Sequence, residues 1–210
     1  MNEDRTGSSE QYHENGRSPE SYRWEHERKE AKRKEKEIND ENERLDNDEK
    51  TINAEIEKRK NAHWKQFSQS NNEIRLLIFI HNNTSETIQL IDTDFDVEDM
   101  SGCDIPPYEI ATMDAKKYFD SNRLSAVTAR NQTFIKKFFT YGAGDMKCHF
   151  DTTMVVKSSF GVFTTTLTPT WAHQASSMGR KKLVCSSRLR AHVPAAPYSY
   201  CLDIHIGQEQ

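Results

Sequence analysis

The sequence lacks the short motifs that mark most enzymes and nucleotide-binding proteins. It contains no nucleophile elbow, no glycine-rich phosphate loop and no H-E-x-x-H zinc motif. The acidic string DTDFDVED, which starts at Asp92, does not fit an EF-hand loop, because Val97 and Cys103 stand where that loop needs glycine and glutamate. We therefore expect no catalytic residue, no cofactor and a protein that is not an enzyme.

Clustered metal ligands are missing as well. The pairs His149 with Asp151 and Asp203 with His205 are two residues apart, so each pair would share one face of a strand. Neither pair has a third ligand that the sequence can name. The aspartates after Asp92 alternate with apolar residues, which favours the solvent face of a strand. The sequence predicts no metal site.

Cysteine pairs and long apolar runs are absent. The four cysteines, at positions 103, 148, 185 and 201, form no C-x-x-C pair, which favours incidental thiols in a reducing compartment. No stretch reaches the roughly eighteen apolar residues that a membrane span needs, and the first residues lack a signal-peptide core. We expect a cytoplasmic protein, with peripheral membrane association or release without a signal peptide.

Apolar residues are few overall and very unevenly placed. They make up 34% of the chain, against roughly 45–50% in a typical globular domain, and most of the deficit lies before residue 71. Residues 1–21 are polar and contain Gly7, Gly16 and Pro19, which predicts a disordered tail. Residues 71–210 have the composition of one folded domain.

Residues 22–68 predict a long charged helix. No glycine or proline lies between Trp24 and Phe67, and good helix formers dominate. One apolar column recurs at every seventh position: Trp24, Ala31, Ile38, Leu45 and Ile52. A coiled coil needs two such columns, and the second column is mostly polar here. A weak homo-oligomer through residues 24–56, docking along a partner and a solvated single helix all stay open.

From Glu73 the apolar period changes to two, which predicts strands. The segment LLIFIHNNTSETIQLID, residues 76–92, reads as a β-hairpin with a turn at NNTSE. Residues 145–157 and 160–171 read as a second hairpin, and residues 110–123 as a loop or short turn. About seven short strands and no further helix predict a mainly β fold: a C-terminal β-sandwich behind the helix and the tail.

Charge is divided along this domain. Residues 73–120 carry a net charge of −8, and residues 121–210 carry +7. The division permits an acidic and a basic pole, although interleaved strands would mix the charges instead. The basic clusters of the helix are diluted by glutamates, so we expect no nucleic-acid partner.

Aromatic and basic residues gather in the second half of the domain. Trp171 and the tyrosines Tyr198 and Tyr200 stand near turn-like, proline-containing segments, and Lys181 and Lys182 supply positive charge. Such side chains suit the interface of a lipid membrane, which makes these five the candidate lipid-binding residues. The same side chains would equally suit stacking on the bases of single-stranded nucleic acid, and the rings could instead fill the core.

Residues 74–207 resemble the aegerolysin and actinoporin-like β-sandwich families. The resemblance lies in the segments IFIHNNTSETIQL, IPPYEIA, FGVFTTTLTPTW and YCLDIHIG. It implies binding of lipid head groups on membranes, in some members together with a second, pore-forming protein. We therefore expect a non-enzymatic, cytolysin-like protein that binds a membrane lipid surface. The alternative is a protein-interaction or assembly module with a helical oligomerisation stalk and no lipid ligand.

Overall fold

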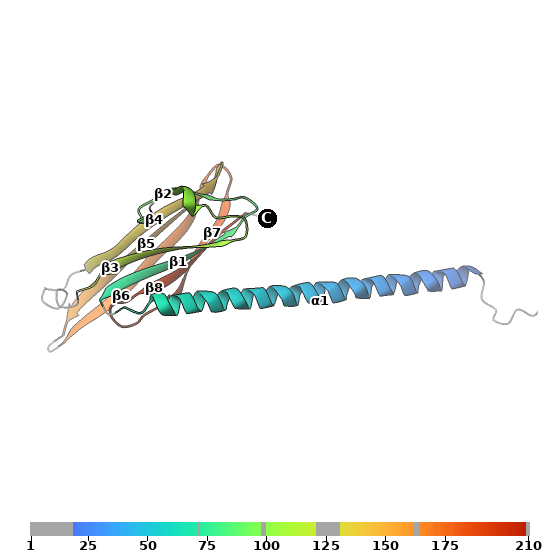
Figure 1. Cartoon of the computed structure of the whole chain (residues 1–210), viewed down its shortest axis with the longest axis horizontal. Coiled ribbons are helices and arrows are strands. Elements are labelled where there is room, and N and C mark those ends of the chain that lie inside the picture. Colours follow the sequence, from blue (N-terminus) through green and yellow to red (C-terminus); the bar gives the residue numbers. More distant parts are fainter. Residues whose placement is uncertain (1–18, 71, 98–99, 121–130, 162–163, 209–210) are drawn as a thin grey trace, which may run out of the picture. The chain divides into compact units, whose positions relative to one another are not determined.

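The computed structural model describes residues 19–70, 72–97, 100–120, 131–161 and 164–208. Within these ranges one α-helix precedes eight β-strands, which form two four-stranded sheets (Figure 1). The predicted mainly β class, a C-terminal sandwich behind a long helix, is confirmed. Of the predicted disordered tail, residues 1–18 lie outside the described residues.

Helix α1 (Pro19–Phe67) begins three residues earlier than the sequence suggested. Proline suits the first turn of a helix, because its missing N–H would have no partner there. Exposed ion pairs four residues apart follow, with Arg33 Nε 3.4 Å from Glu37 Oε1. The chain divides into two compact units after Arg59, so residues 60–67 belong to the sandwich unit although they are helical. Among the described residues, no helix is long and apolar enough to cross a membrane.

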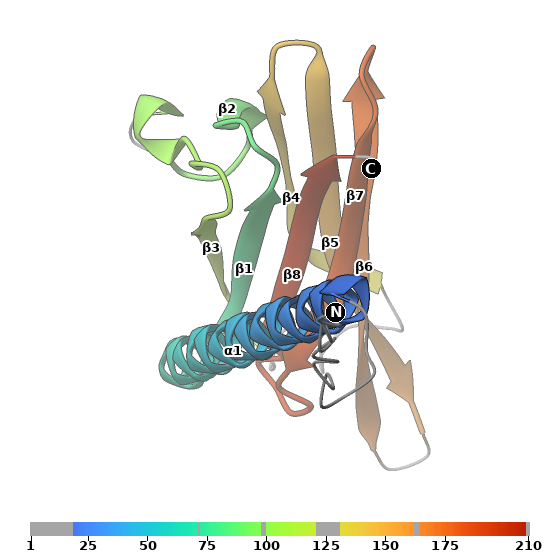
Figure 2. The ribbon, with the colours of Figure 1, turned by 90° about the vertical axis from the view of Figure 1, so that its right-hand side faces the viewer.

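The two sheets have different strand orders (Figure 2). In the first sheet the order is β3 (Ile110–Tyr118), β1 (Glu73–Asn83), β8 (Tyr200–Gln208) and β7 (Leu183–His192). In the second sheet it is β2 (Gln89–Thr93), β4 (Asn131–Ala143), β5 (Met146–Phe160) and β6 (Thr165–Gly179). A short 3-10 helix, η1 (Met100–Cys103), lies between β2 and β3. Neighbouring strands are antiparallel except β1 and β8.

Strand β1 is buried on both faces, which suits its continuous apolar run. Ile78 and its inward-facing neighbours join the core between the sheets. Leu77 and Phe79 point the other way, into a second cluster that Trp64 and Phe67 of α1 cover. Full burial of each such side chain contributes about 1.5–3 kcal/mol. The last turns of the helix therefore complete the fold of the sandwich.

The predicted hairpin at residues 76–92 is wrong, because β1 and β2 belong to different sheets. The chain crosses between the sheets at Asn82, which is fully buried. Its Nδ2 lies 2.8–2.9 Å from the carbonyl oxygens of Glu86, Ile105 and Pro106. Its Oδ1 accepts hydrogen bonds from the backbone N–H and the hydroxyl of Thr84. These contacts satisfy the polar groups of a buried crossover, which a two-strand turn would not need.

The loop or short turn predicted at residues 110–123 is wrong over residues 110–118, which form strand β3. β3 is the edge of its sheet and pairs with β1 along its whole length. An edge strand buries little of its surface, and Lys116 and Lys117 are charged and exposed as such strands require. The predicted hairpin of residues 145–171 is confirmed, since β5 and β6 pair antiparallel.

Strand order separates the two charge blocks. The strands of the acidic segment 73–120 are β1, β2 and β3, and β2 and β3 are edge strands. The outer strands of the basic segment 121–210 are β6 and β7, at the opposite edges of the sheets (Figure 2). The fold therefore gathers the acidic and basic stretches toward opposite edges.

Replacing Asn82 with alanine tests the crossover. The substitution removes the hydrogen bonds of both halves of the buried amide and takes the Oδ1 acceptor away from the buried Thr84 N–H, so we expect Asn82→Ala to lower the free energy of unfolding by about 3 kcal/mol. The neighbouring Asn83 is exposed, and Asn83→Ala should change stability by less than about 0.5 kcal/mol. Urea unfolding of the full chain measures both. Equal effects of the two variants would contradict this role of Asn82.

Candidate functional site

A fully buried carboxylate, Asp203 on β8, is the centre of the most unusual cluster in the sandwich unit. Lys60 Nζ lies 2.6 Å from its Oδ1, an ion pair without the direction of a regular hydrogen bond. Arg188 Nη2 and Arg190 Nη1 donate to its Oδ2 at 3.1 and 3.2 Å. His81 Nε2 stands 3.6 Å from Oδ1. Three permanent cations and one imidazole thus surround a single carboxylate.

Local strand geometry brings these residues together. Asp203 lies in register with Arg188 of β7, which places the two side chains side by side. The register then shifts between Leu189 and Ala191, so Arg190 is the extra residue of a β-bulge. A bulge re-aims a side chain, which explains how two arginines of one strand reach the same carboxylate. Lys60 enters from the last turns of α1.

Two histidines extend the cluster along the sheet. His81 of β1 and His205 of β8 are register neighbours, and their rings stack with centroids 4.2 Å apart. Burial, together with the neighbouring His81, Lys60 and Arg188 side chains, lowers the pKa of His205. A neutral His205 ring therefore stacks on His81 beside the Lys60 cation.

The carboxylate stays ionised. Burial by itself would raise the pKa of Asp203, but the contacts with His81, Lys60 and Arg188 lower that pKa well below its usual range. An aspartate with a depressed pKa contributes stability that is present above its unfolded pKa of about 3.9 and is lost as the pH falls further. The cluster is thus intact at neutral and mildly acidic pH.

A hollow of about 340 Å³ lies beside the cluster, lined by Asn61, Arg188, Leu189, Arg190 and Ala191. Arg190 Nη2 donates to Asn61 Oδ1 at 2.8 Å, whereas the side chain of Arg188 remains 71% exposed. Arg188 and Arg190 both line this hollow with their guanidinium-bearing side chains. Guanidinium groups suit phosphate and carboxylate oxygens, which makes this hollow a candidate anion site.

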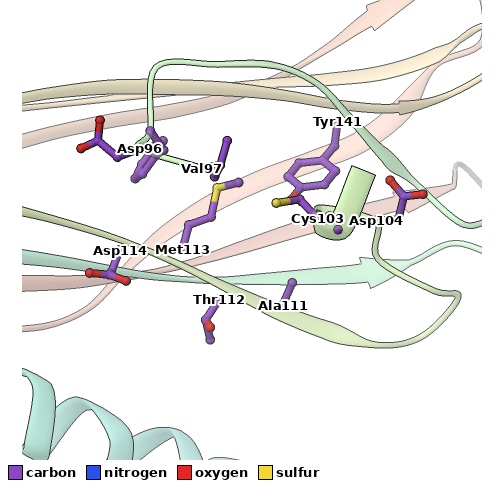
Figure 3. A pocket seen from close by; sticks show the side chains of 11 residues that line it. Asp96, Val97, Cys103, Asp104, Ala111, Thr112, Met113, Asp114 and Tyr141 are labelled. Atoms are coloured by element: carbon purple, nitrogen blue, oxygen red, sulfur yellow. Dashed lines mark hydrogen bonds between the residues drawn. The ribbon is translucent and has the colours of Figure 1, made fainter. Parts of the chain in front are cut away.

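A second cavity, of about 230 Å³, lies on the acidic edge (Figure 3). Its lining includes Asp96, Asp104 and Asp114, and Tyr141 donates a hydrogen bond to the Cys103 carbonyl oxygen at 3.0 Å. Asp96 and Asp114 lie at one end of the view and Asp104 at the other, so the carboxylates do not converge (Figure 3). No group of three His, Cys, Asp or Glu side chains that could hold a metal occurs among the described residues.

The five predicted lipid-binding residues do not form one surface. Tyr200 is fully buried and Tyr198 is 7% exposed, so neither presents its ring at the surface. Trp171 is half-buried in β6, with its ring centroid 6.3 Å from that of Tyr200. Lys181 and Lys182 are exposed, but they follow the end of β6, about 26 Å along that strand from Trp171. Their lipid-binding role stays a prediction.

Sequence reasoning missed the Asp203 cluster. The signal was an aspartate inside the apolar strand YCLDIHIG, because a charge in a buried strand needs a partner. Its partners Lys60, Arg188 and Arg190 come from distant or bulged positions, which no periodicity reveals.

Removing the charge of Asp203 tests the cluster. Asp203→Asn keeps the shape but removes the buried charge that Lys60, Arg188 and Arg190 contact, so we expect a loss of about 3 kcal/mol in the free energy of unfolding at pH 7. The loss should stay constant down to about pH 4. It should shrink below that pH, because the stability that the wild-type carboxylate contributes is itself lost as the pH falls. The exposed Asp151→Asn serves as the control. Urea unfolding across pH measures both, and a loss that vanished already near pH 6 would contradict this account.

Comparison with known proteins adds no family. No protein-family model matches the chain, and no curated protein matches its sequence. The resemblance to the aegerolysin and actinoporin-like families therefore remains a prediction from the sequence segments.

Proposed function

We propose that this chain is a non-enzymatic assembly module in which α1 pairs with the helix of a second copy and so brings two β-sandwiches together. The observation that carries the proposal is the apolar column of the helix. Its large side chains are all exposed: Trp24 72%, Ile38 59%, Leu45 60% and Ile52 59%. A regular column of exposed apolar residues gains most from burial against another helix.

The polar column beside it favours an antiparallel pair. This column holds Arg28, Glu35, Asn42 and Glu49, each four residues after an apolar position. In a parallel pair in register, each charge would meet the identical charge of the second helix inside the seam. In an antiparallel pair each polar residue faces an apolar one instead, for example Glu35 against Leu45 of the second helix. The methylene stem of the polar residue can then cover the apolar partner.

Charged residues on either side of the seam also favour the antiparallel pair. In this antiparallel alignment Lys34 faces Asp48 of the second helix and Lys32 faces Asp46, and two-fold symmetry repeats each pair. Glu27 opposes Glu55, and Glu41 opposes its own copy, which partly offsets the gain. Since the seam is half polar and the flanking charges nearly balance, the pairing is weak and depends on protein concentration.

Engineered disulfides distinguish the two orientations. Position 41 lies next to its own copy only in the antiparallel pair, and position 42 only in the parallel pair. We expect Glu41→Cys to give a disulfide-linked dimer under mild oxidation and Asn42→Cys to give none. Non-reducing electrophoresis of the full chain measures both, with the wild type as the baseline for the native cysteines. A dimer from Asn42→Cys alone would reverse the orientation, and absence of dimers from both variants would overturn the proposed function.

A lipid surface is the second candidate, and a specific feature of the β6–β7 turn favours it. Met178 and Val184 are 49% and 53% exposed, and the exposed cations Arg180, Lys181 and Lys182 lie between them in the sequence. Apolar side chains beside several cations are typical of segments that contact anionic membranes, where each cation contributes about 1 kcal/mol. The resemblance to lipid-binding sandwiches supports the same candidate.

Charge reversal at this turn tests the lipid candidate. Lys181→Glu with Lys182→Glu should abolish co-sedimentation of the full chain with phosphatidylserine vesicles, and wild-type binding should fall as salt rises, because the attraction is screened. Lys116→Glu with Lys117→Glu, an exposed lysine pair on β3, is the matched control and should leave binding unchanged. Wild-type chain that ignores vesicles of every composition would remove this candidate and leave the assembly function standing.

A further inference from the structure

Two cysteines meet across the sandwich. Cys148 lies on β5 and Cys185 on β7, which belong to different sheets. Cys148 is a fully buried member of the main core cluster, and Cys185 is half-buried and packs against that cluster. The two thiols lie close enough for each to shift the pKa of the other. Neither the assembly proposal nor the lipid proposal uses them.

A backbone contact between the two sheets explains why the two cysteines lie close together. Met146, at the start of β5, forms an isolated parallel bridge with Lys181, just before β7. The backbone N–H of Lys181 also donates to the Asp145 carbonyl oxygen at 3.4 Å. From this bridge the two strands run in the same direction. Cys148 follows Met146 by two residues, and Cys185 follows Lys181 by four. Both thiols therefore lie near the end of the strands that this bridge joins.

We propose that Cys148 and Cys185 form a reversible disulfide that joins the two sheets when the chain meets a small-molecule disulfide such as oxidised glutathione. The bond would enclose residues 149–184, which include the whole of β6 and the basic turn that follows it. The third cysteine of the region, Cys201, lies in the separate cluster beneath the helix end.

The two thiols differ in pKa and in exposure, and this difference determines which of them reacts first. The interaction with the neighbouring Cys148 thiol lowers the pKa of Cys185, although burial opposes this. The same contact and burial raise the pKa of Cys148. Cys185 is also the more accessible of the two, so it is the attacking group.

The exchange balances in two steps. The Cys185 thiolate attacks one sulfur of glutathione disulfide, which forms a mixed disulfide and releases one glutathione thiolate that takes up the proton of Cys185. Cys148 then loses its proton, and its sulfur attacks Sγ of Cys185 and displaces the second glutathione, which receives that proton. Two protein thiols are oxidised to one disulfide, and one glutathione disulfide is reduced to two thiols.

Peptide mapping of the full chain tests the proposal. After incubation with oxidised glutathione, non-reducing mass spectrometry should find a peptide containing Cys148 linked to one containing Cys185, and reductant should reverse the link. The midpoint of thermal unfolding should rise by about 8 °C, because the bond closes a long loop of the unfolded chain.

Matched variants keep the test decisive. Cys185→Ser should abolish both the link and the rise in midpoint, whereas Cys103→Ser should leave both unchanged. A persistent glutathione adduct on Cys185, a link that involves Cys103 or Cys201, or four free thiols after oxidation would each overturn the proposal. If Cys185→Ser does not fold, the wild-type and Cys103→Ser maps alone decide between these outcomes.

Discussion

The buried charge of Asp203 is the constraint on which the junction of helix and sheet depends. A carboxylate without solvent costs several kcal/mol unless cations replace the water, so Lys60, Arg188 and Arg190 have to converge on it. The convergence fixes the last turns of α1 over β1 and β8. Trp64 and Phe67 then cover Leu77 and Phe79. An ionic requirement thus selects which apolar surface of the sheet is buried.

Such a cluster contributes more to specificity than to stability. Well-packed apolar residues in place of a buried ion pair are often neutral or stabilising, whereas loss of one partner is costly. A charged site therefore accepts one docking position of the helix and penalises every shifted one. An apolar patch around Leu77 and Phe79 alone would tolerate sliding. We infer that Asp203 sets the register of the helix end on the sheet.

Local pattern predicted the elements, and distant contacts decided how they join. The long helix and the β5–β6 hairpin follow from composition and period, which neighbouring residues set. The crossover at Asn82 does not, because its amide bonds to carbonyls of Ile105 and Pro106, more than twenty residues away. Strand β3 was missed because an edge strand buries too little to show a clear period.

The candidate site shows the same division. The aspartate in YCLDIHIG marks a buried charge that needs a partner, but only the bulge after Leu189 determines that Arg190 is one of them. The prolines around Tyr198 and Tyr200 suggested an exposed loop. The structure instead buries both rings, and the Tyr200 hydroxyl lies 3.3 Å from that of Thr152. Proline near a tyrosine reports backbone shape, not the exposure of the ring.

The half-polar seam of α1 and the basic β6–β7 turn would each make only a weak contact. A helix with one apolar column stays soluble alone and pairs weakly, and a turn with three cations holds an anionic surface weakly. If the helices pair, two turns belong to one particle, and binding of the first raises the effective concentration of the second. Weak pairing then makes surface binding depend steeply on protein concentration, because both contacts have to form together. The assembly and lipid candidates are in that case two steps of one process, in which the sandwich supplies the contact and the helix supplies its multiplicity.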